Sequence, residues 1–251
     1  MLQRYFLQIS YKGANYHGWQ VQPNAASVQE AIEKVLSTLL HENISVVGVG
    51  RTDTGVHASF YMLHFDIEAA IINLEDFVYK LNSFLPNDIA VHQIKKVKDD
   101  AHARFSAVSR TYKYYLTTEK NPFTNETVYW YKRKLDIKSM NEAAKILFEY
   151  IDFTSFSRLH TDVKTNDCNI YQAEWVEERN VLIFIIKANR FLRNMVRAIV
   201  GTLLEVGTGK LSENDFRGII EQKNRKFAGA SAPAHGLFLV DIEYPDDIYL
   251  L

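Results

Sequence analysis

Residues 27–66 read SVQEAIEKVLSTLLHENISVVGVGRTDTGVHASFYMLHFD and predict a helix followed by two strands. Apolar residues recur at helical spacing over 27–40, behind a serine and a glutamate that are spaced as in a capping box. The stretches 44–50 and 60–66 are short and rich in β-branched and aromatic residues, which favours strands. The residues between these strands are therefore expected to form a loop where the first strand ends.

Further elements on either side complete a unit of six. A strand is predicted over 4–10, a helix over 74–85 that Pro86 stops, and a strand over 89–97. The order is strand, helix, strand, strand, helix, strand. This is the order of a ferredoxin-like unit.

The second half of the chain repeats this order, without detectable sequence similarity to the first half. Its expected elements are a strand over 110–118, a helix from a capping box of Ser139 and Glu142 to about Ile151, a hairpin of strands over 172–178 and 181–187, a helix over about 191–206, a helix after Ser212 and a strand over 236–243. We therefore predict an α+β fold of two ferredoxin-like (βαββαβ) halves, joined into a continuous, mainly antiparallel sheet with helices on one side and a central cleft. The predicted domains are an N-terminal lobe over 1–105 and a C-terminal lobe over 106–251.

The composition is that of an ordinary globular protein with local basic segments. Apolar residues make up 47% of the 251 residues, and the formal net charge is -1. Basic residues outnumber acidic ones by eight to three over 101–138, and four basic residues with no acidic one stand over 187–197. These segments fit either solvated surfaces or contacts with a polyanion.

The cellular location is indicated by what the sequence lacks. No apolar run approaches the roughly 20 residues that span a bilayer, and the N-terminus lacks the zones of a signal peptide. Cys168 is the only cysteine, so no intrachain disulfide can form. We expect a cytoplasmic protein that does not contact membranes.

The triplet Asp-Thr-Gly at 53–55 is also found in aspartic-protease half-sites. Such a protease needs two carboxylates that share a proton, and this chain carries the triplet once. The segment EVGTGKL (205–211) suggests a phosphate-binding loop but lacks the first glycine and the final Ser or Thr of that pattern. No HExxH or CxxC pattern is present, so neither a metal site nor a cofactor is predicted.

Asp53 is thus a single carboxylate on a loop. It follows an apolar strand, and Gly50 and Gly55 permit sharp turns on either side. Arg51 adds a basic group two residues away. Two interpretations stay open here, because loop ends on a sheet are common catalytic positions, whereas an Asp side chain can equally tie its own turn.

The stretch GRTDTGVHA (50–58) resembles the signature of the tRNA pseudouridine synthase A family, whose usual form has Ala in place of Thr54. Further stretches resemble family motifs in the same order: YKGANYHGWQVQPNAASVQEAIEKVL near the start, AHARFSAVSRTYKYYL (101–116), DFTSFSR (152–158), FLRNMVRAIVGTLLEVGTGK (191–210) and APAHGLFLVDIEYP (232–245). The resemblance covers almost the whole chain. It departs near TDVKTNDCNIYQ (161–172), where the family often has a further Arg at the place of Cys168.

The resemblance implies an enzyme that converts uridine to pseudouridine in the anticodon stem-loop of tRNA, at positions 38, 39 and 40. It implies a homodimer that binds tRNA and needs no cofactor. In this family the residue matching Asp53 is the catalytic carboxylate, Tyr112 matches the residue that stacks on the flipped base, and Arg197 matches the ion-pair partner of the carboxylate. Arg51 is expected to help flip the base. Contacts with RNA phosphates are expected from Arg110, Lys113, Arg190 and Arg193.

A non-catalytic RNA-binding protein built from two RRM-like units is the alternative, because its topology would be similar. No predicted strand carries the run of aromatic residues and glycines that RRM domains use to bind RNA. Replacing Asp53 by Ala separates the two classes. An isomerase would keep tRNA binding and lose turnover, whereas a binding module would keep its function.

Overall fold

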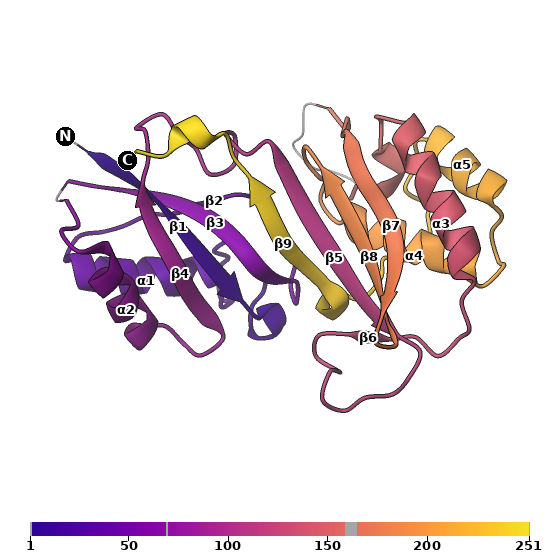
Figure 1. Ribbon diagram of the computed structural model, residues 1–251, viewed down its shortest axis with the longest axis horizontal. Coiled ribbons are helices and arrows are strands. Elements are labelled where there is room, and N and C mark those ends of the chain that lie inside the picture. Colours follow the sequence, from indigo (N-terminus) through magenta and orange to yellow (C-terminus); the bar gives the residue numbers. More distant parts are fainter. Residues whose placement is uncertain (1, 69, 159–164, 251) are drawn as a thin grey trace. The chain divides into compact units, whose positions relative to one another are not determined.

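The chain forms two units, each of mixed α and β structure (Figure 1). The computed structural model describes residues 2–68, 70–158 and 165–250. Unit 1 comprises Met1–Ser109 and Leu239–Leu251, and unit 2 comprises Arg110–Phe238. The division after Ser109 lies close to the predicted boundary at 105. The last strand from Leu239 onward and the C-terminal tail, however, group with unit 1, whereas the predicted C-terminal lobe includes them.

Hydrogen bonds explain why the tail groups with unit 1. The backbone N–H of Val108 donates to the carbonyl of Glu243 at 2.9 Å, and that of Lys98 donates to the carbonyl of Ile248 at 3.0 Å. The Tyr244 hydroxyl donates to the carbonyl of Ala103 at 2.6 Å. Each of these pairs joins residues far apart in the sequence, so no local sequence pattern predicts them.

Unit 1 has the predicted order of elements. These are β1 (Gln3–Tyr11), the 3-10 turn η1 (Gly13–Asn15), α1 (Val28–Leu40), β2 (Val47–Gly48), β3 (His57–Ile67), α2 (Leu74–Phe84), β4 (Ile89–Lys96), the C-terminal strand β9 (Leu237–Glu243) and the 3-10 turn η5 (Asp246–Ile248). The strands lie in the order β4-β1-β3-β9, and β2 pairs with β3. β1 is antiparallel to both of its neighbours, with Leu7 opposite Leu63 on one side and Ile94 on the other.

Strand β2 is shorter than the strand predicted over 44–50. The backbone N–H of Ile44 donates to Ser37 Oγ, and that of Val46 donates to Glu33 Oε1, each at 2.9 Å. Side chains of α1 therefore satisfy donors that the prediction assigned to a strand ladder.

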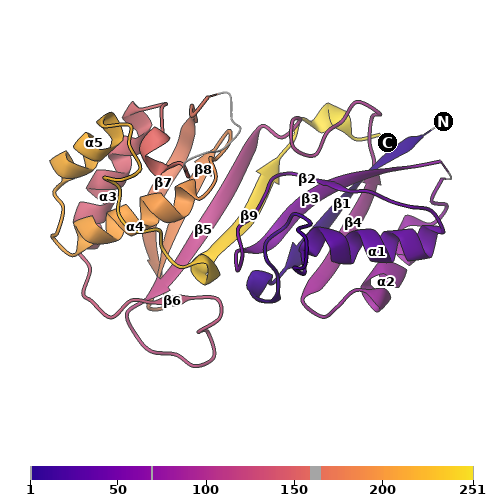
Figure 2. The ribbon, with the colours of Figure 1, turned by 180° about the vertical axis from the view of Figure 1, so that it is seen from behind.

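Helices α1 and α2 cover one face of the unit 1 sheet (Figure 2). α1 begins as predicted, because Ser27 Oγ accepts a hydrogen bond from the N–H of Glu30 at 3.2 Å. Its buried residues are Val28, Ile32, Val35 and Leu36. They follow the helical period, and burying each side chain contributes roughly 1.5–3 kcal/mol.

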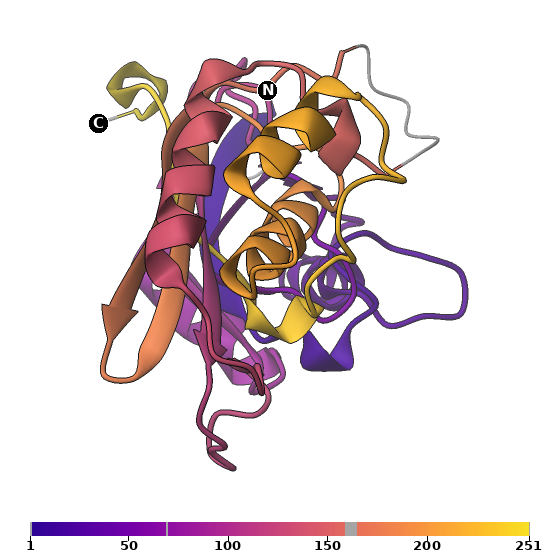
Figure 3. The ribbon, with the colours of Figure 1, turned by 90° about the vertical axis from the view of Figure 1, so that its right-hand side faces the viewer.

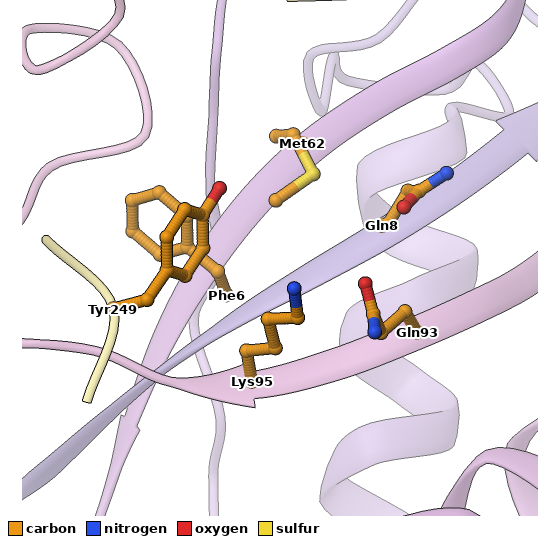
Figure 4. A pocket seen from close by; sticks show the side chains of 6 residues that line it. All are labelled: Phe6, Gln8, Met62, Gln93, Lys95 and Tyr249. Atoms are coloured by element: carbon orange, nitrogen blue, oxygen red, sulfur yellow. The ribbon is translucent and has the colours of Figure 1, made fainter. Parts of the chain in front are cut away.

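The opposite face of this sheet carries a small pocket (Figure 4). Its lining side chains are Phe6, Gln8, Met62, Gln93, Lys95 and Tyr249. Lys95 lies above the Tyr249 ring, with Nζ 4.9 Å from the ring centroid. The volume of about 30 Å³ accommodates little more than one water molecule, so the pocket is too small for a nucleotide.

Unit 2 contains an antiparallel sheet with three helices on one face (Figure 3). Its elements are β5 (Ser109–Thr117), β6 (Tyr129–Trp130), α3 (Ile137–Lys145), the 3-10 turns η2 (Ile146–Glu149) and η3 (Thr154–Phe156), β7 (Ile170–Glu178), β8 (Val181–Ala188), α4 (Met195–Gly207), α5 (Glu213–Glu221) and the 3-10 turn η4 (Ala234–Gly236). The strand order is β5-β8-β7, and β6 pairs in parallel with β5. Arg179 and Asn180 both have positive φ at the β7–β8 turn, as a tight hairpin requires.

Helix α3 differs from its prediction at both ends. Asp136 is its N-cap, with Oδ1 accepting from the N–H of Ser139 at 3.1 Å, so the predicted capping box of Ser139 and Glu142 is wrong. Beyond α3 the chain tightens into the 3-10 turn Ile146–Glu149. That geometry changes which side chains face the core. Phe148, which the helical period places inside, is 50% exposed.

Helix α4 begins at Met195 rather than near 191, because Asn194 before it adopts a left-handed conformation. α5 has the predicted N-cap, Ser212, which forms a capping box with Asp215. The described residues contain no helix with both the length and the apolar character of a membrane span. The predicted α+β class, with mainly antiparallel strands and helices on one side, is confirmed. The central cleft stays a prediction.

Candidate functional site

Asp53 lies in the loop between β2 and β3 and is half-buried, whereas Arg51 is exposed. The backbone turns just after it, because the N–H of Val56 donates to the carbonyl of Asp53 at 3.1 Å. Gly55 provides the positive φ of 78° that this turn needs. The turn is therefore closed by a main-chain hydrogen bond.

Buried aromatic side chains hold the loop on the side before Asp53. The Tyr61 hydroxyl donates to the carbonyl of Gly50 at 2.5 Å, and Tyr11 shares a buried hydrogen bond of 2.9 Å with Thr52 Oγ1. The N–H of Trp19 donates to the carbonyl of Thr52 at 3.3 Å. The rings of Trp19 and Tyr61 stack with centroids 4.2 Å apart. The residue next to Asp53 is thus fixed through both its side chain and its backbone.

Gly18 allows the N-terminal segment to approach this loop. A Cβ at Gly18 would lie 2.4 Å from the carbonyl oxygen of Thr52, and φ is +95° there. An L side chain at this position would meet both a clash and an unfavourable backbone conformation. A glycine is therefore needed where the two segments meet.

His57 holds the loop on the side after Asp53. Its ring is fully buried, and Nδ1 accepts a hydrogen bond from the N–H of Gly13 at 3.0 Å. In the neutral ring the proton then sits on Nε2. His57 thus ties the residues after Asp53 to the 3-10 turn η1.

Sequence reasoning missed the residues that anchor the loop. Tyr11, Trp19 and Thr52 had no individual role in the prediction, and neither did Tyr61. The available signal was the N-terminal stretch YKGANYHGWQ, which contains Tyr11 and Trp19 and matches a family motif. Tyr11 and Thr52 are 41 positions apart, and a single sequence does not reveal such a pair.

Tyr112 is half-buried on β5 in unit 2. Its ring meets the edge of Phe191 with centroids 5.2 Å apart. It pairs with Ile186, and Tyr114 pairs with Phe184, so both tyrosines lie on the face that carries the helices. Burial raises the pKa of Tyr114, whose hydroxyl donates to the carbonyl of Pro233 at 2.9 Å. Tyr114 is therefore part of the core.

Arg197 lies in the first turn of α4 and is half-buried. Its Nε donates to the carbonyl of Ala232 at 2.7 Å, and its own carbonyl accepts from the N–H of Ala232 at 2.9 Å. The Arg197 charge also opposes the rise in the pKa of Tyr114. Arg197 is thus held close to the tyrosine strand of its own unit.

The four predicted phosphate contacts do not all lie together. Arg110 is on the same face of β5 as Tyr112, and its Nη1 donates to the carbonyl of Asn189 at 2.7 Å. Arg190 and Arg193 follow directly in the chain before α4. Lys113 pairs with Ile185 and points to the opposite face. The sheet of unit 2 therefore separates Lys113 from Arg110.

Known proteins resemble this chain over nearly its whole length. A family model described as tRNA pseudouridine synthase matches residues 8–106 and 143–245. The chain belongs to the tRNA pseudouridine synthase family. A tRNA pseudouridine synthase A of Bacteroides fragilis is 57% identical over 99% of this chain and 99% of its own length. Those of Parabacteroides distasonis and Bacillus subtilis are 55% and 43% identical, over 99% and 94% of this chain and 98% and 97% of their own lengths.

Membership of the tRNA pseudouridine synthase family confirms the predicted enzyme class, an isomerase that acts on tRNA. It also disfavours the non-catalytic RNA-binding alternative. The atypical segment near Cys168 lies partly outside the described residues, which omit 159–164. Cys168 itself is buried, and burial raises the pKa of its thiol to about 11, against the opposing charge of Arg190. In this member of the family, the position therefore contributes to the core.

Proposed function

We propose that this chain isomerises uridine to pseudouridine at positions 38, 39 and 40 of the anticodon stem-loop of tRNA, with Asp53 as the catalytic carboxylate. In this reaction the bond between N1 and C1′ breaks, the uracil turns, and C1′ is rejoined to C5. The proton on C5 leaves to solvent and N1 gains one, so the reaction requires no redox partner.

The anchoring of the Asp53 loop is the observation that carries this proposal. Thr52 before Asp53 and His57 after it are both buried and hydrogen-bonded, while Asp53 between them is half-buried. A catalytic group must be held within a fraction of an ångström of its working position. A main-chain hydrogen bond from Val56 also closes the turn at Asp53, which adds to the fixed position of this residue.

The other proposed roles follow from the chemistry that Asp53 would need. An ionised carboxylate in a dry site needs a cation, and Arg197 is the candidate. A flipped base needs an aromatic face, for which stacking supplies about 1–3 kcal/mol, and Tyr112 is the candidate. Phe191 supports this role, because its contact fixes the Tyr112 ring. Arg51, exposed beside Asp53, would fill the space that the flipped base leaves.

Contacts with RNA phosphates are assigned to Arg110, which shares a face of β5 with Tyr112, and to Arg190 and Arg193 in the segment before α4. Lys113 is assigned a smaller contribution, because it is on the other face of the sheet. Each phosphate contact should add about 0.7–0.9 to the magnitude of the slope of log affinity against log salt concentration. Neutralising Arg190 should therefore change that slope more than neutralising Lys113.

Tritium release tests the reaction. tRNA labelled with tritium at C5 of uridine is incubated with the wild type, with Asp53→Asn and with Asp99→Asn, an exposed carboxylate in the same unit. We expect release by the wild type and by the Asp99 variant. Asp53→Asn should lose at least about 10³-fold in rate while its tRNA affinity stays near wild type. Equal release by both variants would contradict the proposal.

A homodimer is also proposed, as family membership suggests. Three exposed apolar side chains of unit 2, Phe148, Ile151 and Tyr171, support it, because they offer a patch for a partner surface. η2, which carries Phe148, packs against β7, which carries Tyr171. Sedimentation should show a dimer that Tyr171→Glu dissociates. A monomer for the wild type, with and without tRNA, would overturn this part.

A further inference from the structure

Residues 118–135 of unit 2 form a long loop between β5 and α3 that extends past the end of the sheet (Figures 1 and 2). The chemistry proposed above gives this 118–135 loop no role. Its exposed basic residues are Lys120, Lys132, Arg133 and Lys134, and its carboxylates are Glu119 and Glu126. The loop therefore carries an excess of positive charge although the whole chain has a formal net charge of -1.

The two ends of the loop are fixed to the sheet. The N–H of Tyr131 donates to the carbonyl of Thr117 at 2.8 Å, and Trp130 Nε1 donates to the carbonyl of Thr118 at 3.3 Å. β6 within the loop pairs Trp130 with Thr117. The basic run that follows Trp130 thus begins at a defined position on the scaffold.

Trp130 brings together charges from both ends of the loop. Lys132 Nζ lies 4.7 Å and Lys120 Nζ lies 5.6 Å from the centroid of its ring. Cations are attracted to the face of an indole ring at such distances. Arg133 and Lys134 come next in the chain. Four positive groups are therefore concentrated in one part of unit 2, on an exposed surface.

The loop is also linked to the proposed base-stacking residue. It continues from β5, the strand that carries Tyr112, and the path from Tyr112 to Thr117 is about 17 Å at roughly 3.3 Å per residue. Tyr129 in the loop touches Tyr114 on β5 and also Tyr131, with centroids 6.4 Å and 5.8 Å apart. A nucleic-acid strand carries one phosphate per roughly 3.4 Å of its axis, so the same length corresponds to about five phosphates.

We propose that the 118–135 loop binds phosphates in a stem of the tRNA, about five nucleotides from the uridine that reacts. This rests on the proposed function, because it takes Tyr112 as the residue that holds the flipped base. Charge complementarity identifies the binding partner of this loop as RNA. Clustered lysine and arginine with interleaved aromatic residues match the phosphate backbone of a nucleic acid, and they require no particular base sequence.

Neutralising the basic run tests this surface. The triple variant Lys132→Gln, Arg133→Gln, Lys134→Gln is compared with Lys34→Gln, Lys96→Gln, Lys226→Gln, which removes the same charge at exposed positions elsewhere. tRNA affinity is measured between about 50 and 200 mM salt. We expect the loop variant to bind tRNA about tenfold more weakly at low salt. The slope of its log affinity against log salt concentration should be smaller in magnitude by about 2 to 3. Its rate at saturating tRNA should stay that of the wild type.

Two outcomes would overturn the proposal. The first is an affinity and a salt slope equal to those of the control triple. The second is a change in oligomeric state without a change in tRNA affinity, which would assign the loop to a contact between subunits. These outcomes are independent of the proposed reaction. If the wild type released no tritium, the proposed function would fail, yet the binding comparison would still decide the role of the loop.

Trp130 provides a second test with a conservative partner. Trp130→Phe keeps a ring for Lys120 and Lys132, whereas Trp130→Ala removes it. We expect the alanine variant to bind tRNA severalfold more weakly and the phenylalanine variant to stay closer to the wild type. Thermal unfolding of both variants monitors the fold. Wild-type affinity in both would show that the ring does not organise the charges.

Discussion

The Asp53 loop of unit 1 and the 118–135 loop of unit 2 are built in opposite ways. The Asp53 loop is short, and buried side chains hold it on both sides, Tyr11 and Tyr61 before Asp53 and His57 after it. The 118–135 loop is fixed at its ends, and Phe123 between them is 94% exposed. Chemistry on a nucleotide needs fixed geometry, whereas attraction to phosphates acts over about a Debye length and tolerates movement.

Among changes outside the proposed catalytic residue, the largest effect is expected where the anchoring is tightest. Gly18→Ala would place a Cβ 2.4 Å from the carbonyl oxygen of Thr52, so the Asp53 loop must shift. A displacement near 1 Å can cost about 10²-fold in rate, and we expect at least that loss in tritium release. Gly50→Ala is the matched control, since a Cβ there meets no atom within 4 Å. Equal activity of the two variants would show that the loop tolerates movement.

The next effect is a dependence of the free energy of unfolding on pH, which is expected to arise in unit 1. Burial lowers the pKa of His64 in β3 to about 4, helped by Arg4 and His102 and opposed by Asp66. The unfolded chain, with a His pKa near 6.5, takes up the proton first as pH falls, so the free energy of unfolding should decrease between pH 6.5 and 4, by at most about 3 kcal/mol. The 118–135 loop contains no histidine and should not contribute.

Urea unfolding at several pH values measures this slope. The N–H of Ala103 donates to His64 Nδ1 at 3.1 Å, and the amide oxygen of His64→Asn can accept the same bond without titrating. The variant should therefore show a flatter dependence on pH. A slope unchanged from the wild type would assign the effect to other groups.

A smaller effect is expected from one anchoring hydroxyl. Tyr11→Phe removes the hydrogen bond to Thr52, which is worth about 1 kcal/mol, and we expect a severalfold loss in the rate of tritium release. Tyr5→Phe is the control, because Tyr5 is also buried in β1 and its hydroxyl bonds to Gln3. It should lose a similar amount of stability and keep the wild-type rate. A loss of rate in both would indicate general destabilisation.

The smallest effect is expected in the 118–135 loop itself. Phe123→Ser replaces a side chain that is 94% exposed, so the free energy of unfolding should change by less than about 0.5 kcal/mol. Thermal unfolding measures this. A larger loss would mean that the ring packs against the rest of the molecule, and the contrast between the two loops would then be weaker.

Local signals in the sequence were sufficient for most of the elements. Ser27 and Ser212 act as N-caps as predicted, and the Arg179–Asn180 turn closes the predicted hairpin. Prediction failed where a neighbour outside the segment decided the outcome. Within the strand predicted over 44–50, two backbone N–H groups donate to side chains of α1 instead of to a neighbouring strand. At the start of α3, Asp136 is the N-cap in place of Ser139.

The sequence by itself determined the family and singled out Asp53, because signature motifs and helix caps are written in residues close together in the chain. The tertiary structure decided what holds that residue in place and which basic residues share a face with Tyr112. It also decided that the tail from Leu239 groups with unit 1. These depend on hydrogen bonds and strand pairs between distant segments, and a linear pattern does not specify such pairs.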